Sequence, residues 1–220
     1  TSLGIYSTVL KEEDGRIRLW YHLRRANTKS KLSLDQAYIG YAESTDGVHF
    51  EKPELNLFEE GGSTTNNVVL PSKLGGSSVW IDPNAPAEEC YKNQTKVYNP
   101  DVSMQFHMHC SPDGIHWKFL RRIQLDLGGG WDSQNIVFWD PAIGRYVLYT
   151  RNWFAQRHGT ADGNINYRTV RRLESDDIIH FDNQRIVMWP DDVDMATYET
   201  DVPLLADAPE KPYGRVPMDY

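Results

Sequence analysis

The sequence predicts an all-β protein built from repeated units of four short strands, and the clearest support is a recurring seven-residue motif. Residues 44–50 read STDGVHF, residues 111–117 read SPDGIHW and residues 175–181 read SDDIIHF. The copies begin 67 and 64 residues apart, a period that indicates a repeat architecture. No window of ten or more residues carries the 3.6-residue apolar spacing of a long amphipathic helix, so helical repeats are disfavoured.

Two further elements follow the same rhythm. Residues 79–83 (VWIDP) match residues 137–141 (VFWDP), and each copy is followed by a β-rich run that contains a tyrosine. Residues 15–17 (GRI) are echoed two periods later by residues 144–146 (GRY). Three independent elements with one period make chance similarity a poor explanation.

The strands inside one unit are clearest after residue 135. Turn residues separate four apolar or alternating runs, which predict strands at 136–139, 145–151, 165–174 and 181–188. Four antiparallel strands in each repeat are typical of a β-propeller blade.

The repeat divides residues 1–220, expected to be a single domain, into about three and a half blades. The expected blades are residues 1–50, 65–117 and 131–181, with residues 190–220 opening a fourth. Propellers close with four to eight blades, so that no long strand edge stays exposed. We therefore expect an incomplete ring, either because the chain is a fragment or because it closes by pairing with a second chain.

Charge and composition narrow the class of partner. The formal net charge is −8, and lysines and arginines form no cluster longer than a pair, which argues against nucleic acid. Aromatic residues make up 12% of the chain, and they suit strands and sugar-binding surfaces. No run approaches the 18 or so apolar residues of a membrane span, so no membrane partner is expected.

Only two cysteines are present, Cys90 and Cys110. They could be buried thiols or one bridge in an exported protein, and the sequence favours a secreted or periplasmic location slightly over a cytoplasmic one. His107 and His109 share one face of a predicted strand, but no third ligand follows at a suitable spacing, so no metal site is predicted. No cofactor is predicted either.

Several segments resemble one enzyme superfamily. Residues 175–181 resemble the outer-strand motif S-D-D-L-x-H-W of glycoside hydrolase family 32, and residues 131–139 resemble that family's inner-strand segment. Residues 38–53, 66–69 and 79–91 are similar to uncharacterised bacterial proteins of the glycosyl hydrolase type. The resemblance implies a five-bladed β-propeller of the family 32 and 43 type.

The resemblance also implies catalytic residues. The first strand of each blade lines the axis in such propellers, and glycoside cleavage needs two carboxyl groups astride the bond. Asp132 would stabilise the transition state, and Glu199, with Asp201 as the fallback, would be the general acid. The nucleophile or base would fall near residues 4–9, where no carboxylate occurs. Without the resemblance, Asp132 reads as a turn residue and Glu199 as a solvated loop acid.

Candidate sugar-binding residues are those with flat aromatic faces, amides or a guanidinium near strand ends. Each of them could equally be a packing or turn residue. They are Asn66, Asn67, Trp131, Gln134, Asn135 and Arg151. Asp82 and Asp140 precede prolines in predicted hairpins and are expected to be structural.

The leading functional hypothesis is an exo-acting glycoside hydrolase that cleaves oligo- or polysaccharides with paired carboxyl groups. A glycoside phosphorylase is the first alternative, in which Arg151, Arg157 and His158 could bind phosphate. The second alternative is a carbohydrate-binding propeller without catalytic activity.

Overall fold

The computed structural model describes residues 2–24, 37–72, 77–99, 103–123, 125, 134–156 and 165–188. These residues form twelve β-strands and one three-residue 3-10 helix, η1 (Ala87–Glu89). The strands are grouped into three four-stranded sheets in which each strand is antiparallel to the next. The protein is therefore all-β, as the sequence predicts.

The strands of each sheet follow one another along the chain. The first sheet contains β1 (Ser2–Lys11), β2 (Ile17–Arg24), β3 (Ala37–Ser44) and β4 (Val68–Ser72). The second contains β5 (Ser78–Ile81), β6 (Tyr91–Asn99), β7 (Ser103–Ser111) and β8 (Lys118–Ile123). The third contains β9 (Ile136–Asp140), β10 (Arg145–Gln156), β11 (Ile165–Ser175) and β12 (Asp182–Met188).

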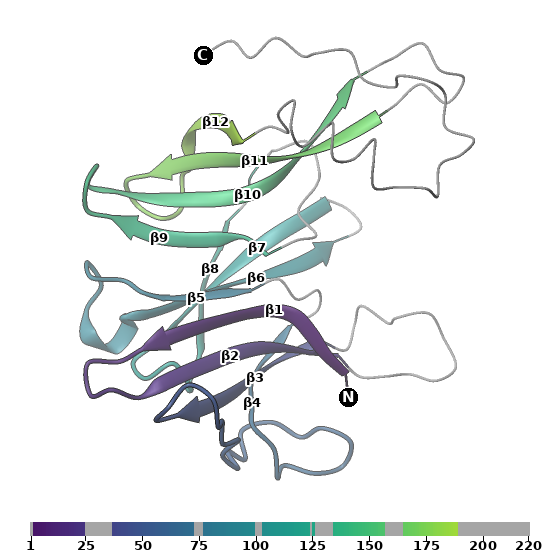
Figure 1. The fold of residues 1–220 in the computed structure, drawn as a ribbon, viewed down its shortest axis with the longest axis vertical. Coiled ribbons are helices and arrows are strands. Elements are labelled where there is room, and N and C mark those ends of the chain that lie inside the picture. Colours follow the sequence, from purple (N-terminus) through teal and green to yellow (C-terminus); the bar gives the residue numbers. More distant parts are fainter. Residues whose placement is uncertain are drawn as a thin grey trace.

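The three sheets lie one after another, as Figure 1 shows. The first strands of neighbouring sheets are in contact, β1 with β5 and β5 with β9. Sheets that meet through their first strands and are built as up-and-down meanders are arranged like blades in part of a propeller. The described residues do not close into a ring, so the number of five blades stays a prediction.

The third sheet has the strands that the sequence predicts, except that β10 runs on to Gln156. The expected first blade ended at residue 50, but β4 pairs with β3 and so belongs to the first sheet. The repeated motif marks the connection between the third and fourth strands of a sheet, not the end of a blade. The sheets therefore span residues 2–72, 78–123 and 136–188, and residues 190–220 lie outside the described residues.

The repeated motif forms one kind of turn in all three sheets. The Ser111 hydroxyl accepts hydrogen bonds from the amides of Asp113 (3.2 Å) and Gly114 (2.9 Å) and donates to the Asp113 carboxylate (2.9 Å). Residues 44–49 repeat these three bonds, and residues 175–180 repeat those between the serine and the aspartate. The side chains of the motif thus satisfy the turn's own amides.

Buried side chains fill the two spaces between neighbouring sheets. Between the first and second sheets they are Trp20, Ile39, Tyr41, Val69, Leu70, Val79 and Tyr91. Between the second and third they are Trp80, Phe106, Met108, Ile123, Val137, Tyr146, Leu148, Leu173 and Ile178. The motif's last aromatic residue joins these clusters, because Trp117 packs against the first and Phe181 against the second.

A tyrosine–carboxylate contact is repeated between the sheets. The Tyr91 hydroxyl donates to Glu12 in the first hairpin of the preceding sheet (2.7 Å), and the Tyr146 hydroxyl donates likewise to Asp82 (2.9 Å). Arg18 also bonds to both members of the first pair. Asp82 is therefore a buried structural residue that links two sheets.

Arg18 and Trp20 fasten the first sheet to the turn motif of the second. The Arg18 guanidinium donates to the Asp113 carbonyl and to the Tyr41 hydroxyl (2.8 Å). The Trp20 indole donates to the Gly114 carbonyl (2.7 Å). The motif of the second sheet is thus both a turn and a docking point for the first sheet.

Cys90 and Cys110 are free thiols, so the two cysteines form no bridge with each other. Burial raises the pKa of Cys110. Across the residues that the structure describes, no helix is both long and apolar enough to cross a membrane.

Candidate functional site

The first strands of the three sheets are tied together by one side chain. Gln134 precedes β9, and its amide donates to the carbonyl of Ser7 in β1 (3.0 Å) and to that of Ser77 just before β5 (3.2 Å). The β5 strand is also joined to β1, because the Val79 amide donates to the Thr8 hydroxyl (3.1 Å). The region around Gln134 is where three sheets meet.

The next residue, Asn135, is completely buried. Its carbonyl accepts a hydrogen bond from the Gln94 amide (2.6 Å), and its side-chain oxygen accepts one from the Thr150 hydroxyl (2.5 Å). Arg151 follows Thr150 in β10. Because adjacent residues of a strand point to opposite faces, the Arg151 side chain leaves on the face away from Asn135.

Asn66 and Asn67 lie apart from this region. They precede β4, which is at the opposite edge of the first sheet from β1. The Asn66 amide donates to the carbonyls of Phe58 (2.7 Å) and Ser63 (3.1 Å). The Asn67 amide donates to the Tyr21 hydroxyl and the Tyr41 carbonyl, both at 2.6 Å. These two side chains hold the long connection between β3 and β4 in place.

The remaining predicted site residues are outside the described residues. They are Trp131, Asp132, Arg157, His158, Glu199 and Asp201. The structure thus brings Gln134 and Asn135 together, and it separates them from Asn66 and Asn67.

The sequence analysis missed a group of buried polar residues in the second strand of the second sheet. Four of the five residues 91–95 (YKNQT) are polar without an aromatic ring, yet all five are buried in β6. Asn93 is 0% exposed, and neither its amide nitrogen nor its oxygen has a hydrogen-bond partner within the described part of the chain. A polar run in the second strand of a four-stranded sheet is the signal that could have indicated this.

His109 faces the same side of the second sheet as Asn93, because the two residues are register partners. Burial and the neighbouring His107 lower its pKa to about 4, so its ring is neutral at pH 7. The His107 and His109 ring centroids are 6.4 Å apart. Among the described residues, no group of three histidine, cysteine or acidic side chains could hold a metal ion.

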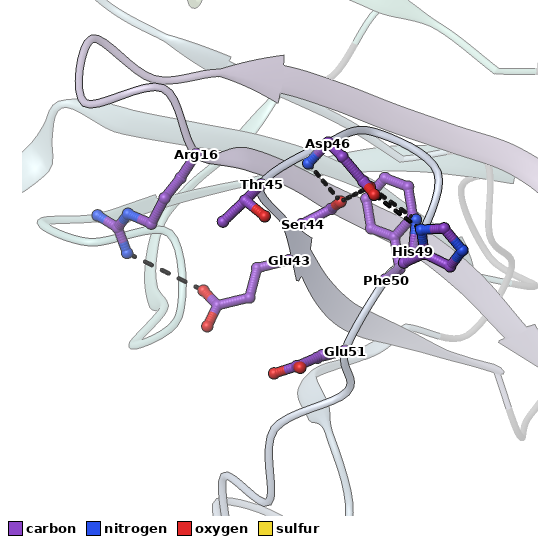
Figure 2. A pocket seen from close by; sticks show the side chains of 8 residues that line it. All are labelled: Arg16, Glu43, Ser44, Thr45, Asp46, His49, Phe50 and Glu51. Carbon is purple, nitrogen blue, oxygen red and sulfur yellow. Dashed lines mark hydrogen bonds and ion pairs between the residues drawn. The ribbon is translucent and has the colours of Figure 1, made fainter.

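A separate hollow of about 280 Å³ lies at the turn between β3 and β4 (Figure 2). None of the predicted site residues lines it. Its lining residues are Arg16, Glu43, Ser44, Thr45, Asp46, His49, Phe50 and Glu51. The hydrogen bonds from His49 and Val48 hold the pKa of Asp46 well below its usual value, so this carboxylate stays charged.

Comparison with solved structures identifies relatives of the fold. An N-acetylgalactosamine deacetylase from F. plautii, in complex with blood group B trisaccharide, matches with a TM-score of 0.53 at 12% identity, over 80% of this chain and 50% of that chain. A thermostable family 43 glycoside hydrolase matches with a TM-score of 0.49 at 15% identity, over 86% and 55%. A Bacteroides ovatus glycosyl hydrolase has a TM-score of 0.48 at 15% identity, over 84% and 51%.

The chain spans about half the length of these three structures. Two of the three proteins are glycoside hydrolases. The deacetylase match shows that this chain shares its fold with part of that protein. No protein-family model matches the sequence. No curated protein matches it either.

Proposed function

We propose that the protein is a glycoside hydrolase-like protein that acts on the ends of oligo- or polysaccharide chains. The observation that carries this proposal is the pair of hydrogen bonds from Gln134, which brings the first strands of three sheets to one point. Asp132 stands two residues before Gln134 in the sequence, and the proposal assigns its carboxyl group to that point. The F. plautii deacetylase, whose fold is similar, is in complex with a trisaccharide in its crystal structure.

The residues of the proposed site have distinct roles. Asp132 stabilises the positive charge of the transition state, and Glu199 protonates the leaving oxygen as the general acid. Trp131 offers a flat face to the sugar, and Arg151 a donor to its hydroxyl groups. The third carboxyl group, the nucleophile or base, comes from a segment other than residues 4–9.

In this proposal, Gln134 and Asn135 support the site and do not contact the sugar. The Gln134 amide nitrogen and the two Asn135 oxygens already bond to protein groups. In the proposal these residues therefore support the start of β9 and do not bind sugar directly. Asn66 and Asn67 are left out of the proposed site for the same reason and because they precede the strand at the other edge of the first sheet.

The test incubates the protein with a panel of oligosaccharides, with and without added phosphate, and measures the reducing sugar that is released. We expect Asp132→Asn and Glu199→Gln each to lower kcat/KM by about a hundredfold or more, as loss of an acid–base or charge-stabilising group does. The matched control is Glu88→Gln, because Glu88 is an exposed acid on η1.

Three outcomes would contradict the proposal. Unchanged turnover in both variants would show that these carboxyl groups are not catalytic. Sugar phosphate released only with added phosphate would indicate a phosphorylase. Sugar binding without turnover in the unmodified protein would indicate a carbohydrate-binding propeller.

A further inference from the structure

The third sheet has one face that no other sheet of the described residues covers. Buried side chains join the first sheet to the second and the second to the third. Figure 1 shows the third sheet at one end of this row, so its second face points away from the other two sheets. The residues on that face have equivalents in the other sheets, and there the next sheet covers them.

The motif serines identify the equivalent residues. Each motif serine pairs with a residue in the second strand of its sheet, and the residues three positions further along that strand are Trp20, Gln94 and Tyr149. Trp20 and Gln94 are each 1% exposed, and each donates a hydrogen bond to a carbonyl of the next sheet or of the residue just before it. Tyr149 is partly exposed. It therefore marks the place where a further element would pack on the third sheet.

Two apolar residues of β9 extend the surface beside Tyr149. Ile136 pairs with Tyr149 and is 49% exposed, whereas Ser78, which pairs with Gln94 in the second sheet, is 4% exposed. The Phe138 ring stacks on the Tyr149 ring, with centroids 6.1 Å apart and planes at 17°. Ile136 and Phe138 point to the same face, because they are two residues apart in a strand. We call Ile136, Phe138 and Tyr149 the end face.

An acid follows the end face along β9. At both interfaces between the described sheets, a tyrosine of the later sheet donates to an acid in the first hairpin of the earlier one. Asp140 is the equivalent of the acceptor Asp82, because residues 137–141 repeat residues 79–83. The two carboxylates are held alike, since Asp140 accepts from the Ala142 amide (2.9 Å) and Asp82 from the Asn84 amide (3.0 Å). The repeat therefore predicts that a tyrosine of a further segment donates to Asp140.

A second copy of this chain is a poor match for the end face. Its first sheet would carry Ile17 where the second and third sheets carry Tyr91 and Tyr146, because Ile17 pairs with the motif serine Ser44. Isoleucine has no hydroxyl to donate to Asp140. The sheets also cover one another in chain order, the second on the first and the third on the second. The residues that follow β12 are therefore the better candidate.

We propose that residues 190–220, which lie outside the described residues, cover the end face and that the Tyr213 hydroxyl donates to Asp140. Tyr213 follows Asp207 by six residues, as Tyr146 follows Asp140. It also lies 67 residues after Tyr146, the spacing of the first two motif copies. An extended chain from the end of β12 to Tyr213 can span roughly 80 Å, several times the width of a four-stranded sheet.

The test is a double-mutant cycle on the full chain, measured by urea denaturation. Tyr213→Phe should lower the folding equilibrium constant about tenfold or more, because it removes a hydrogen bond to a charged group. In an Asp140→Ala protein the same change should lower it less than about twofold, since the acceptor is already missing. Tyr198→Phe is the matched control, and its effect should be the same in both backgrounds.

A second pair of variants tests the end face without altering Asp140. Ile136 and Ile143 have similar exposure in the described structure, 49% and 45%, but Ile143 lies in the turn after β9 and outside the end face. Ile136→Thr should lower the folding equilibrium constant about fivefold or more, because a covered apolar surface is lost. Ile143→Thr should change it less than about twofold.

The proposal fails if Tyr213→Phe has the same effect in both backgrounds, or if Tyr198→Phe is the change that is coupled to Asp140. It also fails if Ile136→Thr and Ile143→Thr are equally mild, because the end face would then be uncovered. A stability that rises with protein concentration and loses this dependence in Ile136→Thr would assign the end face to a second copy and overturn the proposal. All of these readouts are stabilities, so they are independent of the catalytic roles proposed for Asp132 and Glu199.

Discussion

The side-chain amide of Gln134 donates a hydrogen bond of 3.0 Å to the carbonyl of Ser7, 127 residues earlier in the chain. Because the same amide also reaches Ser77, one side chain satisfies carbonyls from two neighbouring sheets. The positions of the first strands therefore depend on it.

Replacing Gln134 by alanine should lower the free energy of unfolding by about 0.5–1.5 kcal/mol, because an exposed and a partly buried carbonyl lose their donor. Gln134→Glu should cost more, since a carboxylate would face two carbonyl oxygens. Urea denaturation measures both changes. Glu88→Ala, at an exposed position, should change stability by less than about 0.5 kcal/mol. Equal stability of Gln134→Ala and the unmodified protein would show that the sheets meet without this contact.

Two glycines with similar backbone angles should respond differently to alanine. Gly114 (φ +71°) and Gly144 (φ +65°) both adopt the left-handed conformation, which costs other residues roughly 1–2 kcal/mol. A Cβ at Gly114 would lie 2.7 Å from the Trp20 ring, whereas a Cβ at Gly144 meets nothing within 4 Å. Gly114→Ala should therefore be the more destabilising variant by about 1–3 kcal/mol, as for an overpacked core. Equal melting temperatures for the two variants would argue against the docking of Trp20 on the second sheet.

The buried Tyr91 should make the protein sensitive to alkaline pH. Burial and the hydrogen bond to Glu12 raise its pKa from 10.0 to about 12. Between these values the unfolded chain has released the phenolic proton while the folded protein keeps it. Its stabilising contribution, complete below pH 10, is therefore lost as pH rises toward 12, by at most about 1.4 kcal/mol per pH unit.

Tyr91→Phe removes this titration, although it also removes a hydrogen bond to Glu12. The variant should be less stable at pH 8, and its stability should fall less steeply between pH 10 and 12. Parallel pH profiles for the two proteins, measured by urea denaturation, would show that Tyr91 is not responsible.

The serine of the turn motif should contribute more to the stability of the protein than an exposed serine that accepts a similar hydrogen bond. Ser111 is fully buried, and its hydroxyl accepts from the amides of Asp113 and Gly114. Ser111→Ala should cost about 1–3 kcal/mol, because these amides lose their acceptor. Ser63 accepts one exposed amide bond, from Thr65 (3.1 Å), so Ser63→Ala should cost less than about 1 kcal/mol. Thermal unfolding of both variants checks the difference, and the reverse order would contradict the role of the motif.

Local sequence signals predicted the strands of the third sheet well. Alternation of side chains and the turn residues around Gly144 are contained in a few neighbouring residues, so they can be recognised without the fold. The motif at residues 44–50 was also recognisable as a turn. Its place between the third and fourth strands was not, because that depends on the pairing of β4 with β3 across a long connection.

The candidate site was less predictable than the strands. Gln134 stood out as an amide near a strand end, but its contacts with Ser7 and Ser77 depend on how three sheets come together. Asn67 carried the same local signal and instead bonds to Tyr21 and Tyr41 at the other edge of the first sheet. An amide side chain suits sugar binding and backbone support equally well, so only the three-dimensional neighbours distinguish the two.

The most direct test of the proposed carbohydrate site is a crystal structure of the protein with a bound oligosaccharide. We predict that the terminal sugar lies at the meeting point of β1, β5 and β9, with the carboxyl groups of Asp132 and Glu199 facing it within about 10 Å of each other. A sugar bound elsewhere, or two carboxyl groups that face different cavities, would contradict the account.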